Sequence, residues 1–333
     1  MTAQTAGQIA ALATAMCWTI TSLSFEAAGR KVGSLQVNVI RLAMAFVMFT
    51  VYLAVRRGQV LPVDAGAHVW IWLSLSGLVG FVLGDLFLFQ AFVDLGARTA
   101  MLIYSSVPPM TAVIGWAVLG ERLSGIQLVA MCATVAGIAI VTTSKAPPPP
   151  RSAAPADAAA AEPAPAAEPA PAAPAEPAPA ANDITERTTH RPRGIWFAVF
   201  GSAGQALGLV LGRYGAPEYD AFAATQIRVL AGLIGFALVF TVARRWRRVA
   251  GAVRNRAAMV HMTRGALFGP FLGVSLGLFA AQRAGTGVAA TIIATVPVML
   301  IPVTMILFRE KTSFRELLGA TLAVGGVGLL FLA

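Results

Sequence analysis

The segment that decides the fold is residues 69–92, VWIWLSLSGLVGFVLGDLFLFQAF. It is apolar throughout except for a few hydroxyl and amide side chains and one charged residue, Asp85. A helix needs about 20 apolar residues to cross the hydrocarbon core of a bilayer. The segment therefore predicts a membrane-spanning helix, and an acid inside such a helix is a candidate functional residue.

The composition of the whole chain agrees with this interpretation. Hydrophobic residues make up 57% of the chain and charged residues only 12%, whereas a soluble domain carries about 25% charged residues. The net charge of +10 is also typical of nucleic-acid-binding proteins. Here the basic residues fall between apolar runs, which fits membrane topology and predicts the lipid bilayer, not nucleic acid, as a partner.

Ten apolar runs predict an all-α integral membrane protein with ten transmembrane helices. The N-terminal run lacks a preceding positive charge and a cleavage site, so we expect it to remain as a spanning helix and not to act as a signal peptide. Cys17 and Cys132 lie inside runs and are expected to be small buried hydrophobic residues. The runs are 7–27, 35–55, 69–92, 99–119, 124–142, 195–212, 221–243, 258–280, 286–308 and 314–332.

Residues 144–193 interrupt this pattern. They are rich in Pro, Ala and Glu and have almost no large apolar side chain, so they predict a disordered linker. The chain is therefore expected to contain a five-helix unit over 1–143, the linker, and a second five-helix unit over 194–333.

The two units repeat one another. A shift of 187 residues aligns Arg41 with Arg228, and a shift of 189 aligns Pro108 with Pro297 and Glu121 with Glu310. Because each unit has an odd number of helices, two consecutive copies must have opposite orientations in the membrane. Inverted repeats of this kind are typical of secondary transporters.

Several motifs resemble the EamA-type family of drug/metabolite transporters. They are Gly84-Asp-Leu-Phe-Leu-Phe-Gln-Ala91, Leu95-Gly-Ala-Arg-Thr-Ala100, Val107-Pro-Pro109 and Leu119-Gly-Glu-Arg-Leu-Ser124. The second copy reads Val296-Pro297 and Phe308-Arg-Glu-Lys311, so Arg309 replaces the glycine of the Gly-Glu turn. The resemblance implies a cofactor-free exporter or exchanger of small metabolites. It also implies a cavity lined mainly by the third, fourth, eighth and ninth helices, with contributions from the first and sixth.

Asp85 has two interpretations. It is either a carboxylate that binds a proton or cation in the cavity, or a structural acid bonded to Arg41 or to nearby backbone. The second unit has Val274 at the aligned position, so the repeat does not predict a paired site. Arg41 and Arg228 could neutralise an acidic group of the substrate or a buried acid, but we favour a scaffold role because they occur in both units.

The remaining candidates are polar or amphipathic side chains within the predicted spans. Pro108, Pro109 and Pro297 are expected to kink their helices and not to bind ligand. Glu121 and Glu310 are expected to cap the helix that follows them, together with Ser124 and Ser313. The further candidates for substrate or coupling-ion contact are Trp18, Gln90, Tyr104, Gln205 and Thr291.

These residues favour a secondary transporter of small organic metabolites, such as amino acids or their derivatives, working by alternating access. A cationic-drug carrier, a sugar-phosphate carrier, a lipid-modifying enzyme and a channel-like protein remain alternatives. We expect no enzyme activity, cofactor or metal, because no catalytic or metal-ligand spacing is present. We expect the protein to lie in a bacterial cell (inner) membrane. The sequence leaves the oligomeric state open, with a homodimer as one alternative.

The basic residues predict an orientation. Of the 25 Lys and Arg residues, 17 lie in the loops after the first, third, fifth, seventh and ninth helices or in the linker, and five lie in the alternate loops. Positive loops prefer the cytoplasm. The count therefore places both termini outside and the linker inside, whereas the family resemblance implies cytoplasmic termini. We favour the charge count, in which Arg244-Arg-Trp-Arg-Arg248 weighs most and would bind anionic lipid headgroups if cytoplasmic.

Overall fold

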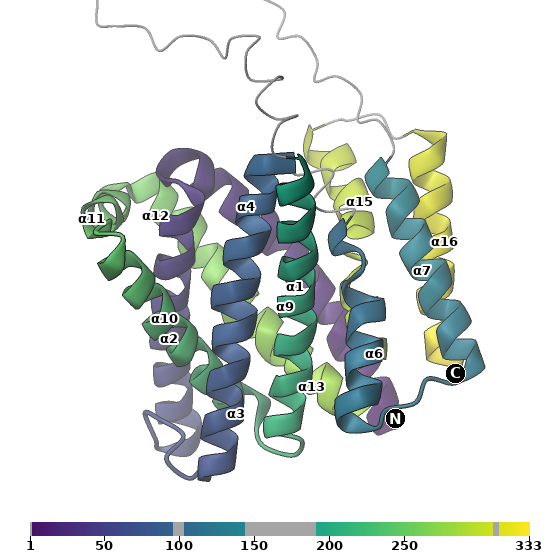
Figure 1. Ribbon diagram of the computed structural model, residues 1–333, viewed down its shortest axis with the longest axis horizontal. Coiled ribbons are helices and arrows are strands. Elements are labelled where there is room, and N and C mark those ends of the chain that lie inside the picture. Colours follow the sequence, from purple (N-terminus) through teal and green to yellow (C-terminus); the bar gives the residue numbers. More distant parts are fainter. Residues whose placement is uncertain (1, 96–102, 144–190, 309–312) are drawn as a thin grey trace, which may run out of the picture.

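The computed structural model describes residues 2–95, 103–143, 191–308 and 313–333, which form a helical bundle with no strand among them (Figure 1). Nine of the described helices, some made of consecutive segments, are long and apolar enough to cross a membrane, and Val107–Leu119 is a shorter apolar helix. The predicted all-α membrane fold with ten spans is therefore confirmed. Most of the predicted linker lies outside the described residues.

The first unit contains five spans. Its third span is one long helix in three segments, α3, η1 and α4, where η1 is π-helical. The segments are α1 (Ala3–Val32), α2 (Ser34–Arg57), α3 (Ala67–Gly77), η1 (Leu78–Gly84), α4 (Asp85–Leu95), α6 (Val107–Leu119) and α7 (Gly125–Thr143).

Among the described residues, the second unit repeats this order and adds the two short helices α11 and α14. Its third span is again divided by a π-helical segment, η2. The segments are α9 (Arg191–Gly215), α10 (Ala221–Val242), α11 (Trp246–Arg254), α12 (Arg256–Ala266), η2 (Leu267–Gly273), α13 (Val274–Ala284), α14 (Thr286–Ile293), α15 (Val296–Phe308) and α16 (Phe314–Leu332).

The two units interlock through their first and third spans. Helix α9 packs along α3, η1 and α4, and α1 packs along α12, η2 and α13. Glycine permits close contact between α9 and the third span: a Cβ atom on Gly208 would lie 2.8 Å from the Cα atom of Gly80, and one on Gly204 would lie 3.0 Å from that of Gly84. Small residues allow such backbone contact within a membrane.

The bundle has two distinct ends (Figure 1). Both chain termini lie at one end, which we call the terminal end, and α7 stops and α9 starts at the opposite end, which we call the linker end. Large apolar side chains such as Val51, Ile71, Ile234 and Leu238 are exposed on the sides of the bundle. Exposed apolar surface between the two ends is what lipid contact requires.

Two details differ from the sequence prediction. Residues Trp246–Arg254 form α11 at the linker end, where a loop was expected (Figure 1). Its apolar positions fall on one face of a short basic helix, a pattern that the search for long apolar runs misses. Cys17 is buried as expected, but Cys132 is exposed on α7, because a residue within a membrane span can face lipid as well as protein.

Candidate functional site

Asp85 is the first residue of α4 and follows η1 directly. The residue is 8% exposed. Its Oδ1 atom accepts a hydrogen bond of 2.8 Å from Nε2 of Gln205 on α9, and its Oδ2 atom is paired with Nη2 of Arg41 on α2. Arg41 also lies over the ring of Phe25, with Cζ 5.4 Å from the ring centroid. A buried carboxylate on α4 is therefore held by one cation from α2 and one amide from α9.

Gln205 links this ion pair to the π-helical segment. Its Nε2 atom also donates to the carbonyl oxygen of Gly80, at 3.1 Å. A Cβ atom on Gly84 would lie 3.1 Å from the same Nε2 atom, so the glycine leaves the space that the glutamine occupies. Single π-helical turns within α-helices are frequent at functional sites. Here such a turn places a backbone carbonyl and the Asp85 carboxylate within reach of one side chain.

The same arrangement has a counterpart in the second unit. Segment η2 occupies the position that matches η1 and precedes Val274 as η1 precedes Asp85. A Cβ atom on Gly273 would lie 3.4 Å from Nε1 of Trp18 on α1, as Gly84 lies against Gln205 on α9. Trp18 and Gln205 therefore occupy related places at the two crossings of a first span with a third span.

Arg228 on α10 is the second buried arginine, 5% exposed. Its Cζ atom lies 5.4 Å from the ring centroid of Phe81. Its Nε and Nη1 atoms have no hydrogen-bond partner among the described residues. We call Arg41, Asp85, Gln205 and Arg228 the central polar cluster.

The remaining candidates for substrate or coupling-ion contact are Tyr104, Gln90 and Thr291. Tyr104 lies within electrostatic range of Asp85. Gln90 donates to Asp94 one turn further along α4, at 2.8 Å. Thr291 is 1% exposed and donates to the carbonyl of Gly287 in its own helix, at 2.7 Å. The structure thus brings Arg41, Asp85 and Gln205 together but gives Gln90 and Thr291 partners of their own.

The three prolines lie where their spans are interrupted. Pro108 and Pro109 are in the first turn of α6, directly after a turn at Ser105–Ser106. Pro297 is the second residue of α15, directly after the turn that ends α14. A proline at the start of a helix costs no hydrogen bond because the first N–H groups have no partner within the helix. In the second unit, where both halves are described, the span is two helices, α14 and α15, joined by a turn.

Glu121 does not cap the helix that follows it, so that prediction is wrong. Gly120 has a φ of 68°, which ends α6 in the left-handed region that favours glycine and turns the chain back. Glu121 then accepts hydrogen bonds of 2.8 Å from both the N–H and the hydroxyl group of Thr286, at the start of α14, and pairs with Arg213 at the end of α9. We call Glu121, Arg213 and Thr286 the terminal latch.

The helix after Glu121 has a cap of its own. Ser124 and Gln127 exchange side-chain to backbone hydrogen bonds of 3.0 and 3.2 Å. In the second unit Ser313 caps α16 as expected, although its partner is Glu316. Glu310 lies outside the described residues.

A second polar contact joins the units in the loops of the terminal end. Asp64 accepts hydrogen bonds from Arg57 at 2.7 Å and from Tyr219 at 3.0 Å. Burial alone would raise the pKa of Asp64, but the bonds from Tyr219 and Arg57 outweigh burial and lower it. This contact therefore stabilises the fold at neutral pH and is lost only as the pH falls through that lowered pKa.

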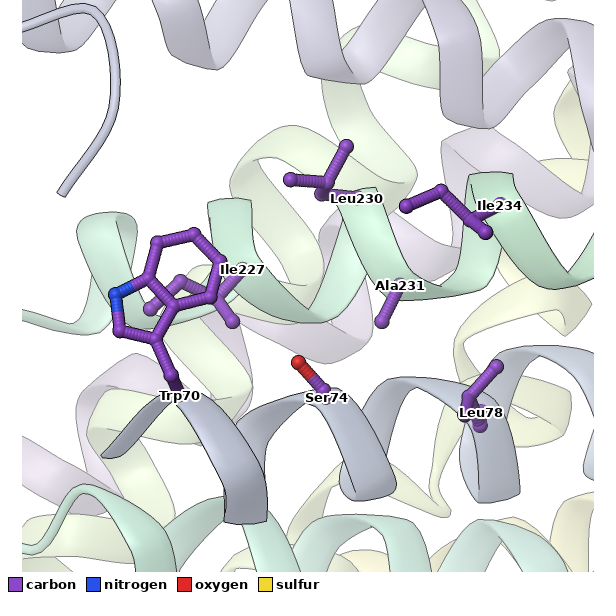
Figure 2. A pocket seen from close by; sticks show the side chains of 7 residues that line it. All are labelled: Trp70, Ser74, Leu78, Ile227, Leu230, Ala231 and Ile234. Carbon is purple, nitrogen blue, oxygen red and sulfur yellow. The ribbon is translucent and has the colours of Figure 1, made fainter. Parts of the chain in front are cut away.

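Figure 2 shows a shallow apolar groove of about 250 Å³, and no residue of the central polar cluster lines it. It runs between α3 and α10, and Ser74 supplies its one hydroxyl group. Such a surface suits lipid chains better than a polar metabolite. The groove is lined by Trp70, Ser74, Leu78, Ile227, Leu230, Ala231 and Ile234.

Among the described residues, no group of three His, Cys, Asp or Glu side chains is placed to hold a metal ion.

Comparison with known proteins gives matches of three kinds. The model of the EamA-like transporter family matches residues 5–143 and 192–332. The threonine/homoserine exporter RhtA of two Salmonella typhimurium strains is 33% identical over 135 residues, which is 39% of this chain and 43% of the exporter. The chain thus aligns with less than half the length of these relatives.

Two further matches are more distant in sequence. An uncharacterized membrane protein of Saccharomyces cerevisiae, YMR253C, is 23% identical over 34% of this chain and 27% of its own length. One crystal structure superposes with a TM-score of 0.69 at 13% identity, covering 99% of this chain and 98% of that chain. At that identity the superposition shows a shared fold and no more.

Proposed function

The chain belongs to the EamA-like transporter family, and from this premise we propose that it is a secondary transporter that exports or exchanges small organic metabolites. Amino acids and their derivatives are the substrate class that we favour, because 135 residues of this chain are 33% identical to a threonine/homoserine exporter. We place the protein in the inner membrane of a bacterium and assign it transport, not catalysis.

The observation that carries the proposal is the central polar cluster. Polar and charged groups are costly inside a membrane and are retained there mainly for function. This cluster lies where the first span of one unit crosses the third span of the other, with a π-helical turn at its centre. Helix interruptions of this kind are typical of substrate and ion sites in transporters built from inverted repeats.

Alternating access follows from the two interlocked units. Opening one end of the bundle requires the units to move apart there while they close at the other end. The terminal latch ties α6 of the first unit to α9 and α14 of the second, so it holds the terminal end shut. Breaking these contacts is the step that opens that end.

Asp85 is suited to couple transport to protons. Its carboxylate either pairs with Arg41 or takes up a proton, and protonation removes the attraction that joins α2 to α4. A proton arriving from one side of the membrane would therefore release Arg41 and change how these helices pack. Coupling needs no second acid in this scheme.

The test is transport by purified protein in liposomes, after profiling of the growth medium around overproducing cells has named the exported compounds. Asp85→Asn should abolish accumulation driven by a pH gradient but retain counterflow exchange without a gradient. Asp220→Asn is the matched control, because Asp220 caps α10 and asparagine caps a helix equally well.

Two results would reject the proposal at different levels. Gradient-driven accumulation by folded Asp85→Asn would remove Asp85 from coupling and leave the transporter intact. Absence of both export and uptake by wild-type protein across the metabolite panel would reject transport of this substrate class.

A further inference from the structure

Arg228 carries a positive charge that the described protein does not neutralise. The residue is buried, and two of its three guanidinium nitrogens, Nε and Nη1, have no hydrogen-bond partner among the described residues. Contact with the ring of Phe81 compensates only in part, because the ring face offers a weak quadrupole and not a negative charge. A buried cation in a membrane protein requires a counter-charge.

The helices around Arg228 supply no such counter-charge. Its guanidinium group lies near Gly80 of η1 and Gly212 of α9, where Cβ atoms would be 3.9 Å from Nη2 and 3.5 Å from Cζ. Helices α3, α9, α10 and α13 contain no Asp or Glu, and η1 contains none either. The nearest carboxylate along the third span is Asp85, and Arg41 and Gln205 already occupy both of its oxygens.

Comparison of the two units explains why Arg228, unlike Arg41, lacks an acidic partner among the described residues. Arg41 and Arg228 occupy matching positions on α2 and α10. Arg41 has Asp85 as its partner, but the position that matches Asp85 is Val274. The central polar cluster therefore contains two arginines and one carboxylate, a net charge of +1, and the missing negative charge belongs at Arg228.

We propose that Arg228 binds the carboxylate group of the transported substrate, with the planar guanidinium forming paired hydrogen bonds to its two oxygens. This assignment rests on the proposed transport function and narrows its substrates to compounds that carry one carboxylate. A monoanion balances the cluster, whereas a phosphate dianion would leave it negative. Gly80 and Gly212 themselves place no side chain against the guanidinium.

The proposed carboxylate site is connected to Asp85. Gln205 bonds both to the carbonyl of Gly80, beside Arg228, and to Asp85. The two charged sites are thus joined through one glutamine. A substrate carboxylate at Arg228 would therefore lie one side chain away from Asp85.

The test is ligand-dependent thermal stability of the full-length protein in detergent. The probes are L-threonine, L-homoserine and acetate, each compared with its carboxamide at equal ionic strength. The wild type should be stabilised by at least one carboxylate and not by the matching amide, because a ligand that binds only the folded protein raises its melting temperature. Arg228→Met should raise the apparent Kd by roughly thirtyfold or more, and Arg228→Lys, which keeps the charge without the planar fork, should lose less.

Arg264→Met is the matched control, since Arg264 is an exposed arginine on α12 and its loss should leave binding unchanged. Size-exclusion profiles establish that the variants are folded, and if Arg228→Met does not fold, Arg228→Lys carries the comparison. Equal stabilisation by carboxylates and amides, no stabilisation by any carboxylate, or wild-type affinity in Arg228→Met would overturn the assignment.

Uptake by the same proteins in liposomes separates this assignment from the proposed function. Transport of L-threoninamide as fast as L-threonine would leave a transporter and reject the role of Arg228. Carboxylate binding that depends on Arg228, without transport of any probe, would keep the site and reject the function.

Discussion

Asp85 and Arg41 form a buried ion pair whose two members come from different spans. Such a pair costs desolvation energy when it forms, but removing one partner alone leaves an uncompensated buried charge. The pair is therefore a strong constraint on which substitutions the protein tolerates, whether or not the acid also binds protons.

A double-mutant cycle measures this constraint. Arg41→Met alone leaves Asp85 without its cation and should lower the free energy of unfolding by about 3–5 kcal/mol. Combining it with Asp85→Leu should restore much of that loss, because no charge is then left unpaired. Thermal melting of the four proteins in detergent gives the comparison, and strictly additive losses would contradict the ion pair.

At the scale of the element, the contact between α9 and η1 depends on glycine. A Cβ atom on Gly208 would lie 2.8 Å from the Cα atom of Gly80 and 3.1 Å from its backbone nitrogen. These are backbone atoms, so the helices themselves must move apart to make room. That movement would also separate Gln205 from Gly80 and Asp85.

Gly208→Ala should therefore destabilise the protein by roughly 1–3 kcal/mol through overpacking and slow transport. Gly325→Ala on α16 is the matched control, because nothing lies within 4 Å of the Cβ position there. Melting temperature and initial uptake rate provide the measurements. Equal behaviour of the two variants would mean that α9 and η1 approach less closely than described.

The terminal latch gives a second prediction at the scale of the element. Glu121→Ala removes the charge pair with Arg213 and both hydrogen bonds to Thr286, and should cost about 2–3 kcal/mol because bonds to a charged group contribute more than neutral ones. Glu121→Gln can still accept from Thr286 and should lose less. Glu218→Gln, an exposed loop acid, serves as the control in melting experiments, and an inverted order of the two Glu121 variants would exclude the latch.

At the scale of the whole molecule, the place of the basic residues in the bundle determines how the protein is oriented in the membrane. Helix α11 and the start of α9 lie at the linker end, away from both termini (Figure 1). Arg244, Arg245, Arg247 and Arg248 lie within or just before α11. The side of the membrane on which this basic helix lies therefore fixes the orientation of the whole protein.

We expect the linker end to face the cytoplasm, because positively charged segments are retained on that side. Alkaline phosphatase fused after Ala333 should then be active and a green fluorescent protein fused there should be dark, while fusions within residues 144–190 should behave in the opposite way. Fluorescent C-terminal fusions would instead support the orientation that the family resemblance implies.

The sequence alone determined the fold class, the ten spans and the division into two related units. These features depend on the length of apolar runs and on glycine and proline positions, which are local properties of the chain in a solvent that permits few alternatives. The family followed from short motifs such as Gly84-Asp85 and Gly120-Glu121, which are also local. The short helix α11 was not predicted, because its apolar face is too short to be recognised in a search for long apolar runs.

Only the tertiary structure decided which partners the polar residues have. The sequence left Asp85 between a proton site and a bond to Arg41, and the structure supplies that bond while adding Gln205 from the other unit. Glu121, which was expected to cap the next helix, instead contacts α9 and α14. Arg41 has an acidic partner, whereas Nε and Nη1 of Arg228 have no hydrogen-bond partner among the described residues. Such partners lie on helices distant in sequence, so they depend on how the two units pack and leave no local pattern.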